Sequence, residues 1–251
     1  MARAPSHDSQ RKAATVVGAT YLFALVPAVF AEFYVRGQLA AGSAAQMAQH
    51  VVEHERLFRL GIASNVTVFA ADVVLIVALY LVLEPVNRGL ALLALAWGLI
   101  ETATLVAVTF TDFNVLRILS GAHNLRAFEA DRLQALAGLS LGAHGDTYNV
   151  GLVFAGLRST AFCYLWLTSR LIPRPLAAWG ILASLLMGAC AYLFIVFPDL
   201  YRVIGVGIYG APIFLFELTM GLWLLLRGLP RSGLPAPVGG DRSPRTLGAA
   251  P

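Results

Sequence analysis

The stretch His144–Arg170, HGDTYNVGLVFAGLRSTAFCYLWLTSR, decides the fold class of this chain. Its apolar run, 147–169, has 23 residues, which at about 1.5 Å per residue is enough to cross a hydrocarbon core of about 30 Å. Arg158 lies at the midpoint of the run. A guanidinium cannot lose its charge, so within a membrane it needs partners from the protein. The stretch therefore predicts a membrane helix that packs against other helices.

The composition places the whole chain among membrane proteins. Of its 251 residues 58% are hydrophobic and only 13% are charged, and the mean hydropathy is +0.73. We therefore expect the lipid bilayer to be its main partner. The 18 basic and 14 acidic residues form no basic run, so nucleic acid is not expected as a partner. Gly-rich phosphate loops, nucleotide motifs and CxxC pairs are absent from the sequence, so no cofactor is expected and a soluble type of enzyme is disfavoured.

Hydropathy predicts an all-α bundle of six transmembrane helices. The expected spans are residues 13–35, 60–83, 89–113, 147–169, 176–197 and 202–226. Two long connections, 36–59 and 114–146, alternate apolar and polar residues at helical spacing, so each is expected to form an amphipathic interfacial helix on the outer face. The polar segments 1–12 and 228–251 are expected to be disordered cytoplasmic tails.

The distribution of basic residues predicts the topology. Six spans put both termini on the same side of the membrane. The short segments on that side carry Arg11, Lys12, Arg88, Arg170, Arg174, Arg227 and Arg231. The positive-inside rule then places both termini in the cytoplasm. Abundant Ala and Gly, with Lys12 as the one lysine, suggest a bacterium, so the expected location is a bacterial cytoplasmic membrane.

Three of the other spans each contain acidic residues at membrane depth. Asp72 and Glu101 lie near the middle of their spans, at the level of Arg158, and Glu217 lies closer to the cytoplasm. A charged residue at mid-bilayer costs about 2.5–3.5 kcal/mol on insertion scales, and such residues usually face the bundle interior and pair. We therefore expect these four side chains to meet, with one guanidinium unable to pair all three acids.

Two more polar residues share helix faces with this cluster. Asn65 lies on the face of Asp72, and Tyr148 on the face of Arg158. The predicted binding site therefore consists of Asp72, Glu101, Arg158, Glu217, Asn65 and Tyr148. Three roles fit such a cluster: structural bonding between helices, binding or transport of a small polar or anionic species or of protons, and catalysis.

The histidines suggest an alternative chemistry at the outer face. His50 and His54 are four residues apart, a spacing at which two imidazoles of one helix can ligate one metal ion, and His144 lies on the same side of the membrane. These residues are candidates for a metal site in a membrane-embedded, metal-dependent hydrolase. Alternatively, they are interfacial polar residues. A non-catalytic interaction subunit is a further alternative.

Several short motifs follow one another in a recognisable order. They are Ala31-Glu32-Phe33 with Arg36, Leu57-Phe58-Arg59-Leu60-Gly61-Ile62, Pro85-Val86-Asn87-Arg88, Leu133-Gln134-Ala135-Leu136-Ala137, His144-Gly145 with Tyr148, and Gly151-Leu152-Val153-Phe154. From Lys12 to Gly228 the chain thereby resembles the bacterial family called domain of unknown function 4386. The resemblance implies six membrane spans and a retained first span, and implies no activity. The family pattern tends to have histidine where this chain has Arg158.

The retained first span carries an acid and a base near its outer end. Glu32 and Arg36 are four residues apart, so they are expected to form a local ion pair on one helix.

Overall fold

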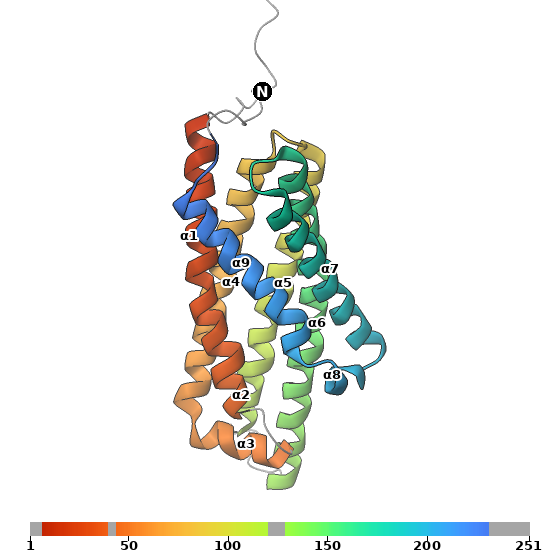
Figure 1. Cartoon of the computed structure of the whole chain (residues 1–251). Coiled ribbons are helices and arrows are strands. Elements are labelled where there is room, and N and C mark those ends of the chain that lie inside the picture. Colours follow the sequence, from red (N-terminus) through yellow and green to blue (C-terminus); the bar gives the residue numbers. More distant parts are fainter. Residues whose placement is uncertain (1–6, 40–43, 120–128, 231–251) are drawn as a thin grey trace, which may run out of the picture.

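The computed structural model describes residues 7–39, 44–119 and 129–230, and all regular structure in these ranges is helical (Figure 1). The elements are α1 His7–Val29, η1 Phe30–Val35, α2 Arg36–Leu39, α3 Ala44–Glu53, α4 Glu55–Leu83, α5 Arg88–Leu119, α6 Ala130–Ser169, α7 Arg174–Val196, α8 Leu200–Val203 and α9 Val206–Leu226.

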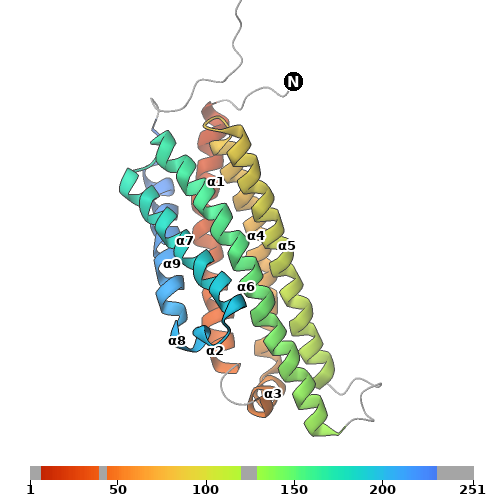
Figure 2. The ribbon, with the colours of Figure 1, turned by 90° about the vertical axis from the view of Figure 1, so that its right-hand side faces the viewer.

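Six helical segments within the described ranges are long and apolar enough to cross a membrane. They are Asp8–Leu39, Glu55–Leu83, Arg88–Leu119, Arg132–Ser169, Arg174–Val196 and Val206–Leu226. The predicted all-α bundle of six membrane-spanning helices is therefore confirmed. Figures 1 and 2 show the long helices side by side, with α2, α3 and α8 at the end of the bundle opposite the N-terminus. We call this end the distal end.

The long connections differ from their prediction. Residues 44–53 form the short helix α3. Helical geometry is interrupted at His54, where φ is −120° and ψ is 37°, and α4 begins at Glu55. The second predicted surface helix does not form a separate element. Residues 130–146 are the first turns of α6, a continuous helix of 40 residues that contains no proline to end it. Part of that prediction, residues 120–128, lies outside the described residues.

The predicted tails are only partly described. Helix α1 begins at His7, inside the segment 1–12, while residues 1–6 and 231–251 lie outside the described residues. The remainder of α1 contains Pro27, which lacks a backbone N–H. The turn that follows, η1, is a π-helical turn with one residue more than an α-helical turn. It carries Glu32, and Arg36 comes directly after it.

Small residues allow the closest helix contacts. A Cβ on Gly156 of α6 would lie 2.7 Å from the Cα of Gly188 on α7, so neither position has room for a side chain. Gly18 of α1 meets α9 in the same way, with a Cβ 3.0 Å from the backbone oxygen of Gly221. Helix α1 thus packs on α9 and α4, and α6 packs on α5 and α7. This arrangement leaves α1 and α6 on opposite sides of a cleft.

Candidate functional site

The centre of the bundle contains a buried ion pair between α5 and α6. Arg158 donates from Nε to Glu101 Oε2 at 2.5 Å and from Nη2 to Glu101 Oε1 at 3.0 Å. The two side chains are only 6% and 4% exposed. Gly98, one turn before Glu101, makes room for the arginine, because a Cβ there would lie 2.6 Å from Arg158 Cδ. The pair is therefore bidentate, desolvated and closely surrounded.

Asp72 and Glu217 lie near this pair but do not bond to it. Both side chains are half-buried, and both interact electrostatically with Arg158. Among the described residues, the structure shows no hydrogen bond or salt bridge to either carboxyl. The four charged residues predicted to meet thus form one electrostatic group. We call Asp72, Glu101, Arg158 and Glu217 the central group.

Asn65 and Tyr148, which the sequence placed with the central group, have their contacts elsewhere. Asn65 Nδ2 donates to Glu32 Oε1 at 3.0 Å, and Tyr148 stacks on His144 with ring centroids 6.0 Å apart. The reason is distance along the helix, because Asn65 precedes Asp72 by seven residues, which is about 10 Å of helical rise.

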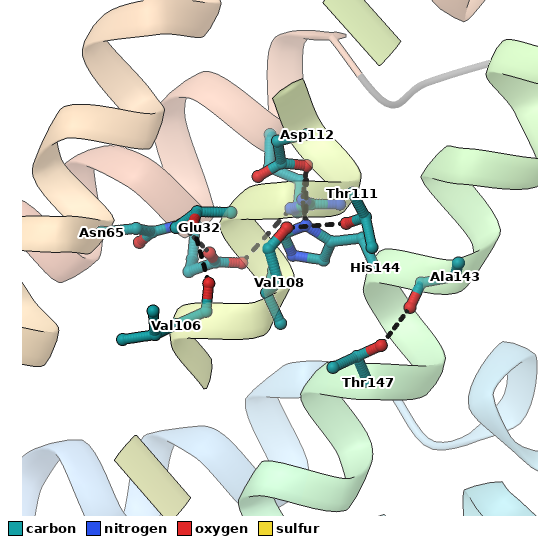
Figure 3. A network of polar contacts seen from close by, with 11 residues as sticks. Glu32, Asn65, Val106, Val108, Thr111, Asp112, Ala143, His144 and Thr147 are labelled. Atoms are coloured by element: carbon teal, nitrogen blue, oxygen red, sulfur yellow. Dashed lines mark hydrogen bonds and ion pairs between the residues drawn. The ribbon is translucent and has the colours of Figure 1, made fainter. Parts of the chain in front are cut away.

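A second set of polar residues lies at the distal end and joins the ends of several helices. Arg36 Nε lies 3.4 Å from Glu32 Oε2, which confirms the predicted local ion pair. Arg36 Nη2 also lies 3.6 Å from Asp112 Oδ1 on α5. Figure 3 shows Glu32, Asn65, Asp112 and His144 turned toward one another. We call Glu32, Arg36, Asn65, Asp112 and His144 the distal network.

His144 is the most buried member of the distal network, with 2% exposure. Its Nδ1 lies 2.9 Å from Asp112 Oδ1 and also contacts Arg36 Nη2. A ring nitrogen either donates or accepts, so one tautomer donates to Asp112 and the other accepts from Arg36. The other ring nitrogen, Nε2, is buried and has no hydrogen-bond partner among the described residues.

A cleft of about 590 Å³ connects the two polar groups. At its distal end the cleft is lined by Glu32, Arg36 and His144, and its inner end reaches Glu217. Val206 and Glu217, which both line it, are 11 residues apart on α9, or about 16 Å at helical rise. Arg158 is not among the lining residues.

The candidate metal ligands do not come together. His54 Nδ1 faces the backbone oxygen of His50 at 3.2 Å, whereas His144 is engaged by Asp112 and Arg36. Throughout the part of the chain that the structure describes, no three His, Cys, Asp or Glu side chains are arranged to hold a metal ion.

Asp112 is the site residue that the sequence analysis missed. It lies 11 residues after Glu101, which is about three helical turns, so both carboxyls point from the same face of α5. That spacing was the available signal. Hydropathy does not single out Asp112, because it lies at the end of the predicted span 89–113, next to the segment expected to form a surface helix.

Six apolar helices with charged side chains enclosed between them define a multi-pass helical membrane protein. Residues 16–228 match the model of the domain of unknown function family DUF4386, and the chain belongs to this family. Comparison with curated proteins found no match, and comparison with solved structures found none either.

Proposed function

We propose that this protein binds a small polar species, or passes such a species or protons across the membrane, by way of the cleft and the central group. The observation that carries the proposal is the position of Glu217. Its carboxyl lines the inner end of an open cleft and, within the described residues, has no hydrogen bond or ion pair. An ionisable residue at membrane depth is costly to retain, which supports a functional role.

Structural bonding between helices accounts for only part of the central group. Glu101 and Arg158 satisfy each other with two hydrogen bonds, so this pair is explained as a link between α5 and α6. The same explanation does not extend to Glu217, which bonds to no helix through its side chain in the described structure. Glu217 therefore favours binding or passage over a purely structural role.

Of the species considered, an anion has the least support. The Arg158 guanidinium is bound to Glu101 and lies outside the cleft lining. Arg36 does line the cleft, but the carboxylates of Glu32 and Asp112 already lie within 4 Å of its guanidinium. Neither cation is free to receive an anionic ligand. A proton, or a ligand that pairs with a carboxylate, suits the lining better.

The test is proton flux in liposomes that contain the purified protein, measured with an enclosed pH-sensitive dye after a pH step. Glu217→Gln removes the titratable group with almost no change in shape and should abolish the protein-dependent flux. Glu84→Gln is the matched control, because Glu84 pairs with Arg88 in the turn between α4 and α5, away from the cleft. Equal flux for the unmodified protein, Glu217→Gln and Glu84→Gln would show that Glu217 has no role in proton passage.

A further inference from the structure

We propose that the cleft binds an amphipathic organic cation, with its positive charge against Glu217 and its apolar part on the aromatic wall. This inference rests on the function proposed above and specifies the chemistry of the ligand. It combines the charge of the cleft, the character of its wall and the fact that the carboxyl of Glu217 has no bonded partner within the described ranges.

The charge of the lining favours a cation. The acidic residues of the lining are Glu32, Asp146 and Glu217. Among the described residues that line the cleft, Arg36 is the only arginine or lysine. Arg36 and Glu32 already neutralise each other. The remaining acids give the cleft a negative potential, and apolar walls intensify such a potential. A cationic ligand would be attracted into the cleft and an anion repelled.

The wall of the cleft favours an apolar body. Phe33, Phe194 and Phe214 line it together with Tyr148 and Tyr209. Aromatic faces attract cations and also bury apolar surface. The volume of about 590 Å³ lies in the range of pockets that enclose a drug-sized molecule. A small inorganic cation would leave most of this aromatic surface unused.

The depth of Glu217 explains why the ligand must have both properties. The acid lies about 16 Å along α9 from Val206 at the distal end of the cleft. A strongly hydrated ion would lose its water on the way without recovering polar contacts from a largely apolar wall. An organic cation with its charge spread under apolar groups has little hydration to lose and gains the carboxylate at the end.

Tetraphenylphosphonium and tetraphenylborate provide a direct test, because they have nearly the same shape and opposite charges. Binding of each ion to the detergent-solubilised protein is measured by equilibrium dialysis, with protein-free micelles as the blank. We expect the cation to bind at least about tenfold more tightly than the borate, as a carboxylate in a low-dielectric site requires.

Variants show which residue is responsible. Glu217→Gln should weaken binding of the phosphonium by about tenfold or more and should not weaken binding of the borate, because it removes a charge that repels the anion. Glu217→Asp keeps the charge and should retain most of the affinity, and Glu84→Gln should bind like the unmodified protein. Thermal denaturation of each variant verifies that it is folded.

Each outcome decides between defined alternatives. Equal binding of the two ions overturns the inference in favour of an unselective apolar cleft. No effect of Glu217→Gln overturns it by showing that the cation binds away from that carboxyl. Tighter binding of the borate overturns it in favour of an anion site. Failure of the phosphonium to bind, together with proton flux that depends on Glu217, refutes the organic cation and leaves the proposed function standing. Phosphonium binding without flux refutes proton passage alone.

Discussion

Glu101 and Arg158 are 57 residues apart in the chain, yet they form a two-pronged ion pair at the centre of the bundle, with contacts of 2.5 and 3.0 Å. The neighbouring acids Asp72 and Glu217 interact electrostatically with the same guanidinium without bonding to it. The central group thus divides into a satisfied pair and two acids without direct partners among the described residues. Of these two acids Glu217 is the one that lines the cleft, so the proposed ligand site rests on this carboxyl.

The buried pair can be tested by removing one member and then both. Arg158→Met leaves the Glu101 carboxylate desolvated and unpaired, which should cost about 3–5 kcal/mol of stability. Glu101→Leu combined with Arg158→Met removes both charges and should recover most of the loss. Thermal unfolding in detergent measures both effects. If the double variant were no more stable than Arg158→Met, the loss would not come from the unpaired acid.

Gly98 should tolerate no side chain. Gly98→Ala would place a Cβ 2.6 Å from Arg158 Cδ and 2.8 Å from Ile76 Cδ1, so the arginine must move away from its partner. Overpacking of this kind costs about 1–3 kcal/mol. Gly142→Ala in α6 is the control, because no atom of the described residues lies within 4 Å of its added Cβ. Similar melting temperatures for the two variants would contradict this close packing.

The distal network should stabilise the bundle more than a surface ion pair does. Arg36→Met leaves Glu32 and the 4% exposed Asp112 without their cation, so we expect a loss of about 1–3 kcal/mol. Arg59→Met removes the ion pair in which Arg59 Nε lies 2.7 Å from Glu55 Oε1. These two side chains are 54% and 48% exposed, so the expected loss is about 0–1 kcal/mol. Chemical denaturation of both variants measures the difference. An equal loss would show that the network does not act as a unit.

A side chain added inside the cleft should block it. Gly210 lines the cleft, and among the described residues an added Cβ meets only Val206 of its own helix, at 3.3 Å. Gly210→Leu should therefore reduce phosphonium binding and proton flux without unfolding the protein. Gly207→Leu is the control on the same helix. In the described structure nothing lies within 4 Å of a Cβ added to Gly207, and this residue does not line the cleft. Equal loss in both variants would place the ligand elsewhere.

The sequence predicted the fold because hydropathy alone identifies apolar helices of this length. It also predicted that Arg158 would find an acid, since an unpaired guanidinium at membrane depth is too costly. The prediction could not choose between Asp72, Glu101 and Glu217, because depth along a helix does not fix rotation toward a neighbour. That choice depends on the contact between α5 and α6 and on the space left by Gly98.

Within the distal network the sequence predicts the Glu32–Arg36 ion pair but not its contacts to the other helices, and the reason is a different one. Its members come from segments as distant as Glu32 and His144, and two of them lay at the predicted ends of spans. Span ends are the least certain part of a hydropathy profile, because helices such as α6 extend far beyond the apolar core. The cleft could not be predicted either, since it results from how α1 and α6 are held apart by their neighbours.

The wide turn Phe30–Val35 has a consequence for how this chain tolerates insertions and deletions. A deletion from an ordinary helix changes the phase of everything beyond it by about 100°, whereas a wide turn takes up its surplus residue locally. Deleting a single residue from this turn would therefore restore ordinary winding and leave Arg36 facing Asp112, whereas the same deletion earlier in α1 would swing the guanidinium away. The turn is therefore the place in this helix where the loss of one residue is best tolerated.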